Sequence, residues 1–410
     1  MTPRWFLHRL LRTDRSVLLL HGALLLVLIG GLLTHFTGLS GHLTLRAGEP
    51  ADCFADSKGF RHDLPFSLFL DTCSVIHHPG TEYVAQYTAR LHTSPDGRPM
   101  QLSVNRIERR DGFRFYLMAC HPETHSIRLD IRHDTAGTAC AYTGFALFLA
   151  TFTARLIRRH RRQRRRTAGH RSRPGRHRFR PAGIGLLVLL GICLVVHFIQ
   201  RWRITGYVPL ASGYDTLTFT ALCLCITALA VRNRFPFALP GGLLLAGCML
   251  FGAHLHPSAA SGQVAPVLRS PLLFLHVSVI LFSYTLLAFT FFHAIAGLVA
   301  HRLHHPRMVR RLQRASQALL APAVLSLSAG IALGAVWSNI SWGGWWSWDP
   351  KELWALLTLL VYVVPLHRRV ASALSARGAA MYHLYMGLAF LVLLMTWFGV
   401  RLLGGMHSYA

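Results

Sequence analysis

Acidic residues are scarce in this chain: its 410 residues include 16 Asp and Glu against 43 Lys and Arg, a formal net charge of +27. Motifs of several enzyme classes are missing as well. No HExxH pair, nucleophile elbow or P-loop is present, so the sequence gives no support to a zinc protease, an esterase or an ATPase. Transport by this chain therefore cannot draw on its own hydrolysis of ATP.

Cysteine occurs at eight positions, but no two of them form a CxxC pair. Four cysteines lie in apolar runs, where we expect buried core thiols: Cys193, Cys223, Cys225 and Cys248. The other four lie in or beside a more polar segment: Cys53, Cys73, Cys120 and Cys140. A disulfide can form among these four, but the sequence does not decide its pairing.

Long apolar runs dominate the rest of the chain, which is 52% hydrophobic. Several runs approach the ~20 residues that a helix needs to cross a bilayer. The first run lacks an obvious small-residue cleavage site, so we expect it to stay as a membrane anchor. The runs predict an all-α polytopic membrane protein with about nine transmembrane helices, at residues 16–36, 137–157, 182–200, 215–231, 236–253, 271–297, 316–336, 351–367 and 379–402.

Residues 37–136 differ in character, because Asp, Glu, Pro, Gly and His return and the long apolar runs stop. Glu82–Leu91 and Phe113–Leu117 alternate apolar and polar residues, which is typical of strands. The dipeptides Asp96-Gly97 and Asp111-Gly112 are typical of tight turns. We therefore expect a small β-rich extracytoplasmic domain inserted between the first two spans.

Arginine is concentrated between the apolar runs. Residues 155–180 contain thirteen arginines and no acid. Such a stretch would suit a nucleic-acid site, but both flanks are predicted spans, so the positive-inside rule favours a basic cytoplasmic linker over residues 158–181. Arginines also precede the first span and recur in alternate loops. This pattern predicts a multi-pass protein of the cytoplasmic (inner) membrane, with a cytoplasmic N-terminus, an extracytoplasmic C-terminus and no nucleic-acid partner.

Tryptophan clusters in residues 337–354, which hold six of the nine: Trp337, Trp342, Trp345, Trp346, Trp348 and Trp354. The segment ends in a helix start, because Asp349 suits the N-cap, Pro350 the first helical position and Glu352 a capping box. An aromatic belt at the membrane interface is the alternative interpretation. A belt spreads over many helices, however, and needs neither Gly343-Gly344 nor this cap. We therefore expect a rigid, tryptophan-lined loop just outside the bilayer.

The segment Trp342-Gly-Gly-Trp-Trp-Ser-Trp-Asp-Pro-Lys-Glu-Leu-Trp354 closely resembles the tryptophan-rich WWD segment of the heme-handling proteins of cytochrome c biogenesis, most of all the CcsA/ResC branch of System II. Earlier in the chain, Arg61-His-Asp-Leu-Pro-Phe66 and Gly112-Phe-Arg-Phe-Tyr116 resemble the extracytoplasmic part of CcsB/ResB proteins. The chain thus looks like a natural fusion of the CcsBA type.

The resemblance divides the chain into three parts. It implies a CcsB/ResB-like half at residues 1–157, the basic linker at 158–181, and a CcsA/ResC-like seven-span heme-handling domain at 182–410.

Two histidines are expected near the height of the tryptophan loop. His276 lies about six residues into a span entered from outside, which is ~9 Å deep, and His407 follows the last span. One imidazole on each side of an aromatic slot would supply both axial ligands of a heme iron. The resemblance agrees, because Leu275-His-Val277 and His407-Ser-Tyr409 resemble the stretches that hold the outer histidines of CcsA proteins. The alternative is a packed His276 and a solvated His407.

A second pair of histidines is expected near the cytoplasmic face. His367 ends the span that begins at the tryptophan segment, and the resemblance makes it one of two membrane histidines that take up heme. His21, about five residues or ~7 Å inside the first span, lies at a similar depth. His35 lies at the opposite end but stays a rival, because Thr34-His-Phe-Thr-Gly38 also looks CcsB-like. A third interpretation makes His21 only a helix-packing hydrogen bonder.

The resemblance implies a heme exporter and cytochrome c heme lyase. Heme b would be both substrate and ligand, entering between His21 and His367 and held outside by His276 and His407 against the tryptophans. There it would be joined to the two thiols of a Cys-x-x-Cys-His segment of an apocytochrome c, with thiol-reducing proteins as further partners. Asp349 is assigned first to loop geometry and second to direct catalysis.

Two other functions stay open. The first is a heme carrier that serves a separate lyase. The second is a small-molecule transporter whose tryptophan loop is only an interfacial anchor.

Overall fold

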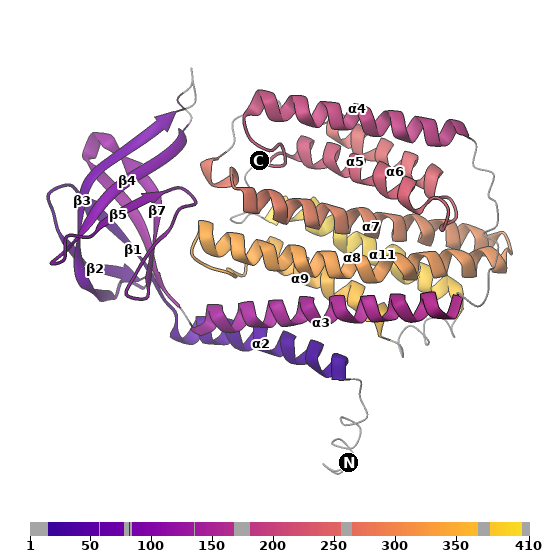
Figure 1. Cartoon of the computed structure of the whole chain (residues 1–410), viewed down its shortest axis with the longest axis horizontal. Coiled ribbons are helices and arrows are strands. Elements are labelled where there is room, and N and C mark those ends of the chain that lie inside the picture. The colour runs from indigo at the N-terminus through magenta and orange to yellow at the C-terminus, as the bar shows by residue number, and fades with distance from the viewer. Residues whose placement is uncertain are drawn as a thin grey trace, which may run out of the picture. The chain divides into compact units, whose positions relative to one another are not determined.

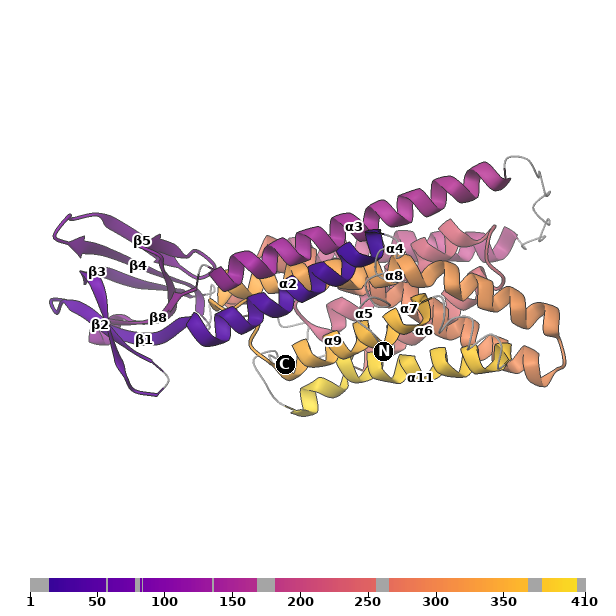
Figure 2. The same cartoon turned by 90° about the horizontal axis from the view of Figure 1, so that it is seen from below.

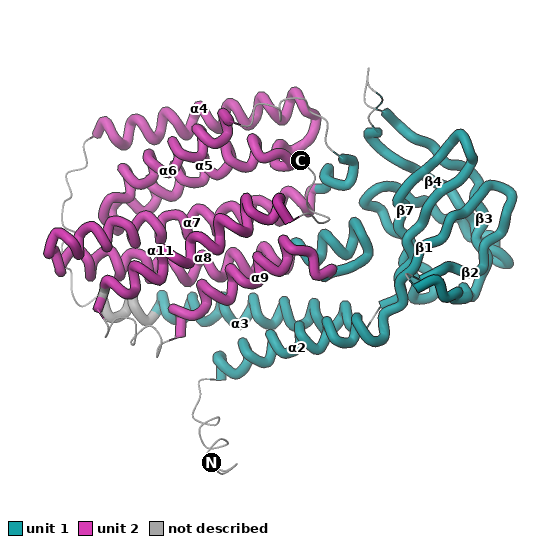
Figure 3. The backbone as a smooth tube through the Cα atoms, turned by 180° about the vertical axis from the view of Figure 1, so that it is seen from behind, with its two compact units in different colours: residues 1–165, 265–270, 334–346 teal, residues 166–264, 271–333, 347–410 magenta. Residues whose placement is uncertain are grey.

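A computed structural model describes residues 15–56, 58–77, 82, 84–134, 136–167, 181–255, 265–367 and 378–403. The chain forms two compact units (Figure 3). Unit 1 comprises Met1–Arg165, Ala265–Ser270 and Gly334–Trp346, and unit 2 comprises Arg166–Val264, Pro271–Leu333 and Ser347–Ala410. The tryptophan segment is therefore divided between the two units.

Two helices of unit 1, α2 (Arg15–Thr37) and α3 (Ala136–Thr167), run side by side in both Figure 1 and Figure 2. Small residues let their backbones approach closely. A Cβ added at Gly30 would lie 2.6 Å from the Ala141 nitrogen, and one at Gly144 would lie 2.7 Å from the Ala23 oxygen. A larger side chain at either glycine would push the two helices apart.

Between α2 and α3 the chain forms one eight-stranded antiparallel sheet, in the order β5-β4-β3-β2-β1-β8-β7-β6 (Figure 1). The strands are β1 (Leu39–Arg46), β2 (Ala51–Asp56), β3 (Arg61–His77), β4 (Val84–Ser94), β5 (Pro99–Ser103), β6 (Glu108–Arg110), β7 (Phe113–His121) and β8 (Ser126–His133). The predicted β-rich domain is confirmed. The turns at Asp96-Gly97 and Asp111-Gly112 lie where the sequence indicated, with positive φ at both glycines.

The sheet curls around its own core. Strands β3, β4 and β5 contact β7, and a bridge between Ser103 and Arg106 joins the ends of β5 and β6. The residues facing inward are apolar, with Phe54, Phe115 and Ile131 at most 2% exposed. Burial of each such side chain contributes about 1.5–3 kcal/mol. The opposite face of β7 and β8 carries polar residues, which positions them for contacts outside the sheet.

The remaining helices are α4 (Pro181–Thr205), α5 (Gly213–Val231), α6 (Ala238–His254), α7 (Pro271–Arg302), α8 (Pro306–Ser341), α9 (Pro350–Val363) and α11 (Ala379–Trp397). All but the last turns of α8 belong to unit 2. Within the described ranges, seven helices are long and apolar enough to cross a membrane, and α6 and α9 are shorter. Each of these nine helices overlaps one predicted span, and the prediction of a polytopic helical protein with a β-rich insertion is confirmed.

Candidate functional site

The tryptophan segment is more helical than the sequence suggested. Helix α8 runs through Trp337 to Ser341, so the irregular loop covers only residues 342–349. The helix ends because Gly343 adopts a φ of +80°, a conformation that glycine reaches without a steric penalty. The Ser338 hydroxyl donates to the Gly344 carbonyl at 2.6 Å and closes the turn.

The predicted cap of α9 is present. The Asp349 carboxylate accepts from the Lys351 backbone N–H at 2.9 Å, in an extended N-cap conformation. Glu352 reaches back to accept from the backbone N–H groups of Ser347, at 2.8 Å, and Asp349, at 3.3 Å. Both carboxylates therefore satisfy the free N–H groups of a helix start, which holds the end of the loop in one conformation.

The six tryptophans differ in exposure. Trp337 is 2% exposed, and its ring contacts that of Trp342 edge to face, with centroids 4.7 Å apart. Trp345 is 5% exposed, and its indole N–H donates to the Thr34 hydroxyl on α2 at 3.0 Å. Trp348 is 66% exposed. Trp337 and Trp345 therefore anchor the segment, while the rings that remain at least partly exposed are those of Trp342, Trp346, Trp348 and Trp354.

A buried hydrogen-bond cluster ties the end of α8 to the polar face of β7. Arg114 donates to the Asn339 side-chain oxygen at 2.7 Å, and the Tyr116 hydroxyl donates to the Asn339 carbonyl at 3.0 Å. The Asn339 amide in turn donates to the Tyr142 hydroxyl at 2.8 Å. The sequence predicted a strand over Phe113–Leu117 but gave no role to Arg114 or Tyr116. Strand alternation places both residues on one face, away from the core.

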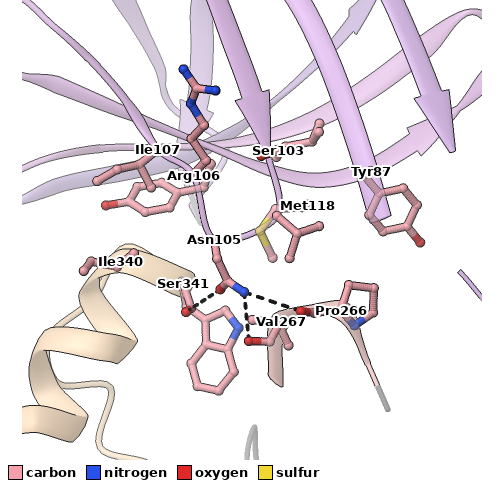
Figure 4. A pocket seen from close by; sticks show the side chains of 14 residues that line it. Tyr87, Ser103, Asn105, Arg106, Ile107, Met118, Pro266, Val267, Ile340 and Ser341 are labelled. Atoms are coloured by element: carbon pink, nitrogen blue, oxygen red, sulfur yellow. Dashed lines mark hydrogen bonds between the residues drawn. The ribbon is translucent and has the colours of Figure 1, made fainter. Parts of the chain in front are cut away.

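A cavity of about 180 Å³ lies in unit 1 beside this cluster (Figure 4). The Asn105 amide donates to the Val267 carbonyl at 3.1 Å, and its oxygen accepts from the Ser341 hydroxyl at 2.8 Å. Figure 4 shows Asn105 between the Pro266–Val267 segment and the end of α8. Aromatic and apolar side chains line much of the rest, including Tyr87, Met118 and Trp342. The three segments that form unit 1 thus meet around one small cavity.

The candidate histidines share one feature of orientation. His276 has Nδ1 2.7 Å from the Gly330 carbonyl on α8, while His21 and His367 have Nδ1 2.8 Å and 3.2 Å from the carbonyls four residues earlier, at Val17 and Val363. An Nδ1–H that donates to a carbonyl leaves the lone pair on Nε2, which is the arrangement usual for a metal-binding imidazole.

Neither predicted histidine pair is tested by the structure. His407 lies outside the described residues. His21 belongs to unit 1 and His367 to unit 2. The rival His35 is an exposed residue of α2 whose ring packs edge to face on Phe36.

Two histidines to which the sequence gave no role lie in the interior of unit 2. His293 on α7 and His383 on α11 are both 0% exposed. Their Nε2 atoms lie 3.3 Å and 3.2 Å from the Pro236 and Val309 carbonyls. Gly297 leaves room for the His383 ring, because a Cβ there would overlap it. These histidines join helix ends to neighbouring helices, a role that their apolar surroundings in the sequence did not indicate.

Comparison with known protein families shows which family this chain belongs to. A family model described as "Cytochrome C assembly protein" matches residues 185–407, which is more than half of the chain. The chain belongs to the cytochrome c assembly protein family. A second model, the ResB-like family, matches residues 14–126. This assembly protein thus joins a ResB-like segment to a cytochrome c assembly domain, as in CcsBA-type fusions, and it is a multi-pass membrane protein.

Individual relatives agree with the family. The cytochrome c biogenesis protein CcsA of Synechococcus sp. (strain WH7803) is 31% identical over 273 residues, which cover 55% of this chain and 83% of the relative. CcsA of Chlamydomonas reinhardtii is 32% identical over 54% of this chain and 67% of the relative. Protein NrfI of Wolinella succinogenes is 35% identical over 51% of this chain but only 24% of that longer protein.

Proposed function

We propose that this assembly protein carries heme b across the cytoplasmic membrane and attaches it to the Cys-x-x-Cys-His segment of an apocytochrome c. The observation that carries the proposal is the way in which the tryptophan segment is held. Its helical end is tied to β7 through Asn339, Trp345 is bonded to α2, and the Asp349 cap fixes its other end. The rings of Trp342 and Trp346 in unit 1 and of Trp348 and Trp354 in unit 2 stay at least partly exposed, and they would contact the flat apolar macrocycle of heme.

His276 and His407 would hold the iron of heme at this surface, and the tautomer of His276 supports that role. Its Nδ1 lies 2.7 Å from a backbone carbonyl of the adjacent helix, which restrains the ring and raises the basicity of Nε2. The substrate's own histidine could displace one of these two imidazole ligands.

Attachment needs positioning more than acid–base catalysis. Each cysteine S–H adds across one vinyl C=C bond of heme, which forms a C–S bond and a C–H bond and leaves no electrons to be supplied or removed. The protein would aim the vinyl groups at the incoming thiols. Those thiols must arrive reduced, so thiol-reducing proteins are the expected partners beside heme and apocytochrome c.

Heme would enter through a second pair of ligands, His21 and His367, near the cytoplasmic face. Both rings have Nδ1 near the carbonyl four residues earlier, and both are exposed residues of their own unit. His35 remains the rival to His21. The orientation that this route requires has the N-terminus in the cytoplasm, and the tryptophan loop and C-terminus outside.

Co-expression with an apocytochrome c, in cells without any other heme lyase, tests the proposal. The wild type should yield cytochrome whose heme survives denaturing electrophoresis, and His276→Ala should abolish that signal. His254→Ala is the matched control, because His254 is an exposed histidine at the end of a different helix, α6, and should behave as wild type. Heme-loaded protein without covalent product would instead identify a carrier. Colourless protein from heme-replete cells would identify a transporter of another kind.

A further inference from the structure

Two arginines lie side by side on the polar face of β7 and β8. Arg114 and Arg132 are direct partners in the antiparallel ladder, and Tyr116 pairs with Asp130 next to them. Their ladder neighbours Phe115 and Ile131 point into the core and are 0% exposed. Like charges at directly opposed positions destabilise a sheet, so this pair needs compensation.

Neutral hydrogen-bond acceptors, and not a carboxylate, bind the Arg114 guanidinium. It is 7% exposed and donates to the Asn339 side-chain oxygen at 2.7 Å and to the Asp134 backbone carbonyl at 3.2 Å. The Asp134 carboxylate is occupied elsewhere. It accepts from the Thr34 and Thr138 hydroxyls and from the Gly137 N–H. Among the residues that the structure describes, no negative charge therefore offsets Arg114 at ion-pair distance.

Arg132 differs from Arg114, because its guanidinium makes no hydrogen bond and no ion pair with any residue that the structure describes. It is nevertheless covered by the tryptophan loop. A Cβ added at Gly343 would lie 2.7 Å from the Arg132 Nε, and one at Gly344 would lie 3.1 Å from its Nη1. A side chain at either position would crowd the guanidinium, so the backbone of the loop lies close to it.

The nearest acid does not neutralise this site. Burial raises the pKa of Asp130, and its charge only partly counters the burial that lowers the pKa of the Arg132 guanidinium. Two partly buried cations thus share one face, and no carboxylate within the described ranges forms an ion pair with either. The Arg132 guanidinium is only half-buried, so a carboxylate from a ligand could reach it and supply the ion-pair partner that the described residues do not.

We propose that Arg132 binds a carboxylate of the ligand that rests on the tryptophan loop, and that this carboxylate is a propionate of heme. The inference rests on the proposed function. A guanidinium presents a planar fork of donors that matches a carboxylate. The propionates are the anionic groups at the edge of protoheme. Holding them against β8 directs the opposite, vinyl-bearing edge away from the sheet, toward an arriving Cys-x-x-Cys-His segment.

The role of Arg132 is tested by comparing the affinities of two kinds of heme for the full-length protein. The protein is purified in detergent and stripped of its own heme first. Protoheme and its dimethyl ester have the same ring and iron but differ in charge at the propionates. The wild type should bind protoheme about 10- to 100-fold more tightly than the ester, which corresponds to a charge-assisted hydrogen bond of about 1.5–3 kcal/mol. Arg132→Gln should bind the two hemes within about twofold of each other. Arg128→Gln, on an exposed residue of the same strand, should keep the wild-type preference.

The outcomes separate this inference from the proposed function. A wild type that binds both hemes equally, or an Arg132→Gln variant that keeps the full preference, overturns the role of Arg132 and leaves heme binding in place. A wild type that binds neither heme overturns the proposed function. Arg132→Lys keeps the positive charge but lacks the planar fork of donors, so it should show an intermediate preference for protoheme over the ester. This second variant keeps the test decisive if Arg132→Gln misfolds.

Discussion

At the scale of single residues, side chains of the same type have different roles: some are buried and hold the fold together, and others are exposed and available for function. Trp345 buries its ring and donates to Thr34, whereas Trp348 is 66% exposed. The same division separates the thiols. Cys120 on β7 is 5% exposed and lies within hydrogen-bonding reach of Cys73 on β3, so β3 and β7 place two of the four unassigned cysteines together across the core.

This thiol pair has a predicted pH dependence. Burial, reinforced by the hydrogen bond and charge of Cys73, raises the pKa of Cys120 to about 12. Below that pH the thiol form dominates, and only the thiolate reacts. We expect the rate at which iodoacetamide alkylates Cys120 to rise about 100-fold between pH 8 and pH 10. Mass spectrometry of the peptide that contains Cys120 measures this rate. A rate that levels off near pH 9 would contradict the raised pKa. Cys73→Ala should react faster at pH 8.

At the scale of elements, α8 and α9 meet in a loop whose two ends are fixed by different means. Glycine at 343 lets α8 stop, and the Asp349–Glu352 capping box starts α9. The box explains why acids stand in an otherwise acid-poor segment. Each carboxylate accepts backbone N–H groups, which fits the role in loop geometry that the sequence assigned first to Asp349.

Substitution of Asp349 separates geometry from charge. Asparagine caps helices about as well as aspartate, whereas alanine costs about 0.5–2 kcal/mol. We expect Asp349→Asn to keep most of the holocytochrome yield and Asp349→Ala to lower both that yield and the thermal midpoint of the purified protein. If Asp349→Asn loses attachment while its midpoint stays at the wild-type value, the negative charge itself takes part in the reaction.

At the scale of the whole molecule, the chain joins a ResB-like segment at residues 14–126 to an assembly domain at 185–407. The tryptophan segment belongs to both compact units, because Gly334–Trp346 falls in unit 1 and Ser347 begins the next part of unit 2. The proposed route through the membrane likewise takes ligands from both parts of the chain, His21 from the first and His367 from the second.

The route predicts an order of heme loss. If the inner site feeds the outer one, His367→Ala should deplete heme at both sites, while His276→Ala should lose only the outer heme. Heme per protein, measured as the pyridine hemochrome, distinguishes these outcomes. His21→Ala should match His367→Ala, and His35→Ala should keep the wild-type content. The reverse result for the last two variants would make His35 the inner ligand, and a full outer complement in His367→Ala would refute the entry route.

Several features follow from the sequence alone because they depend on near neighbours along the chain. Apolar run length predicted the helices, alternation and Asp-Gly turns predicted the strands, and Asp349-Pro-Lys-Glu352 predicted the cap. The predicted span ended at residue 336, but helix α8 continues to Ser341. The sequence did not indicate this extension, because tryptophan and serine have no strong preference for either helix or loop.

Other features were decided only by tertiary structure. Trp345 meets Thr34 and Arg114 meets Asn339 across more than 200 residues of sequence, and Arg132 lies beneath Gly343. Such contacts depend on which faces of distant elements pack together, and local periodicity carries no information about that choice. For the same reason the sequence could name the tryptophans as a group, but only the packed structure separates the buried rings that anchor the loop from the rings that stay exposed.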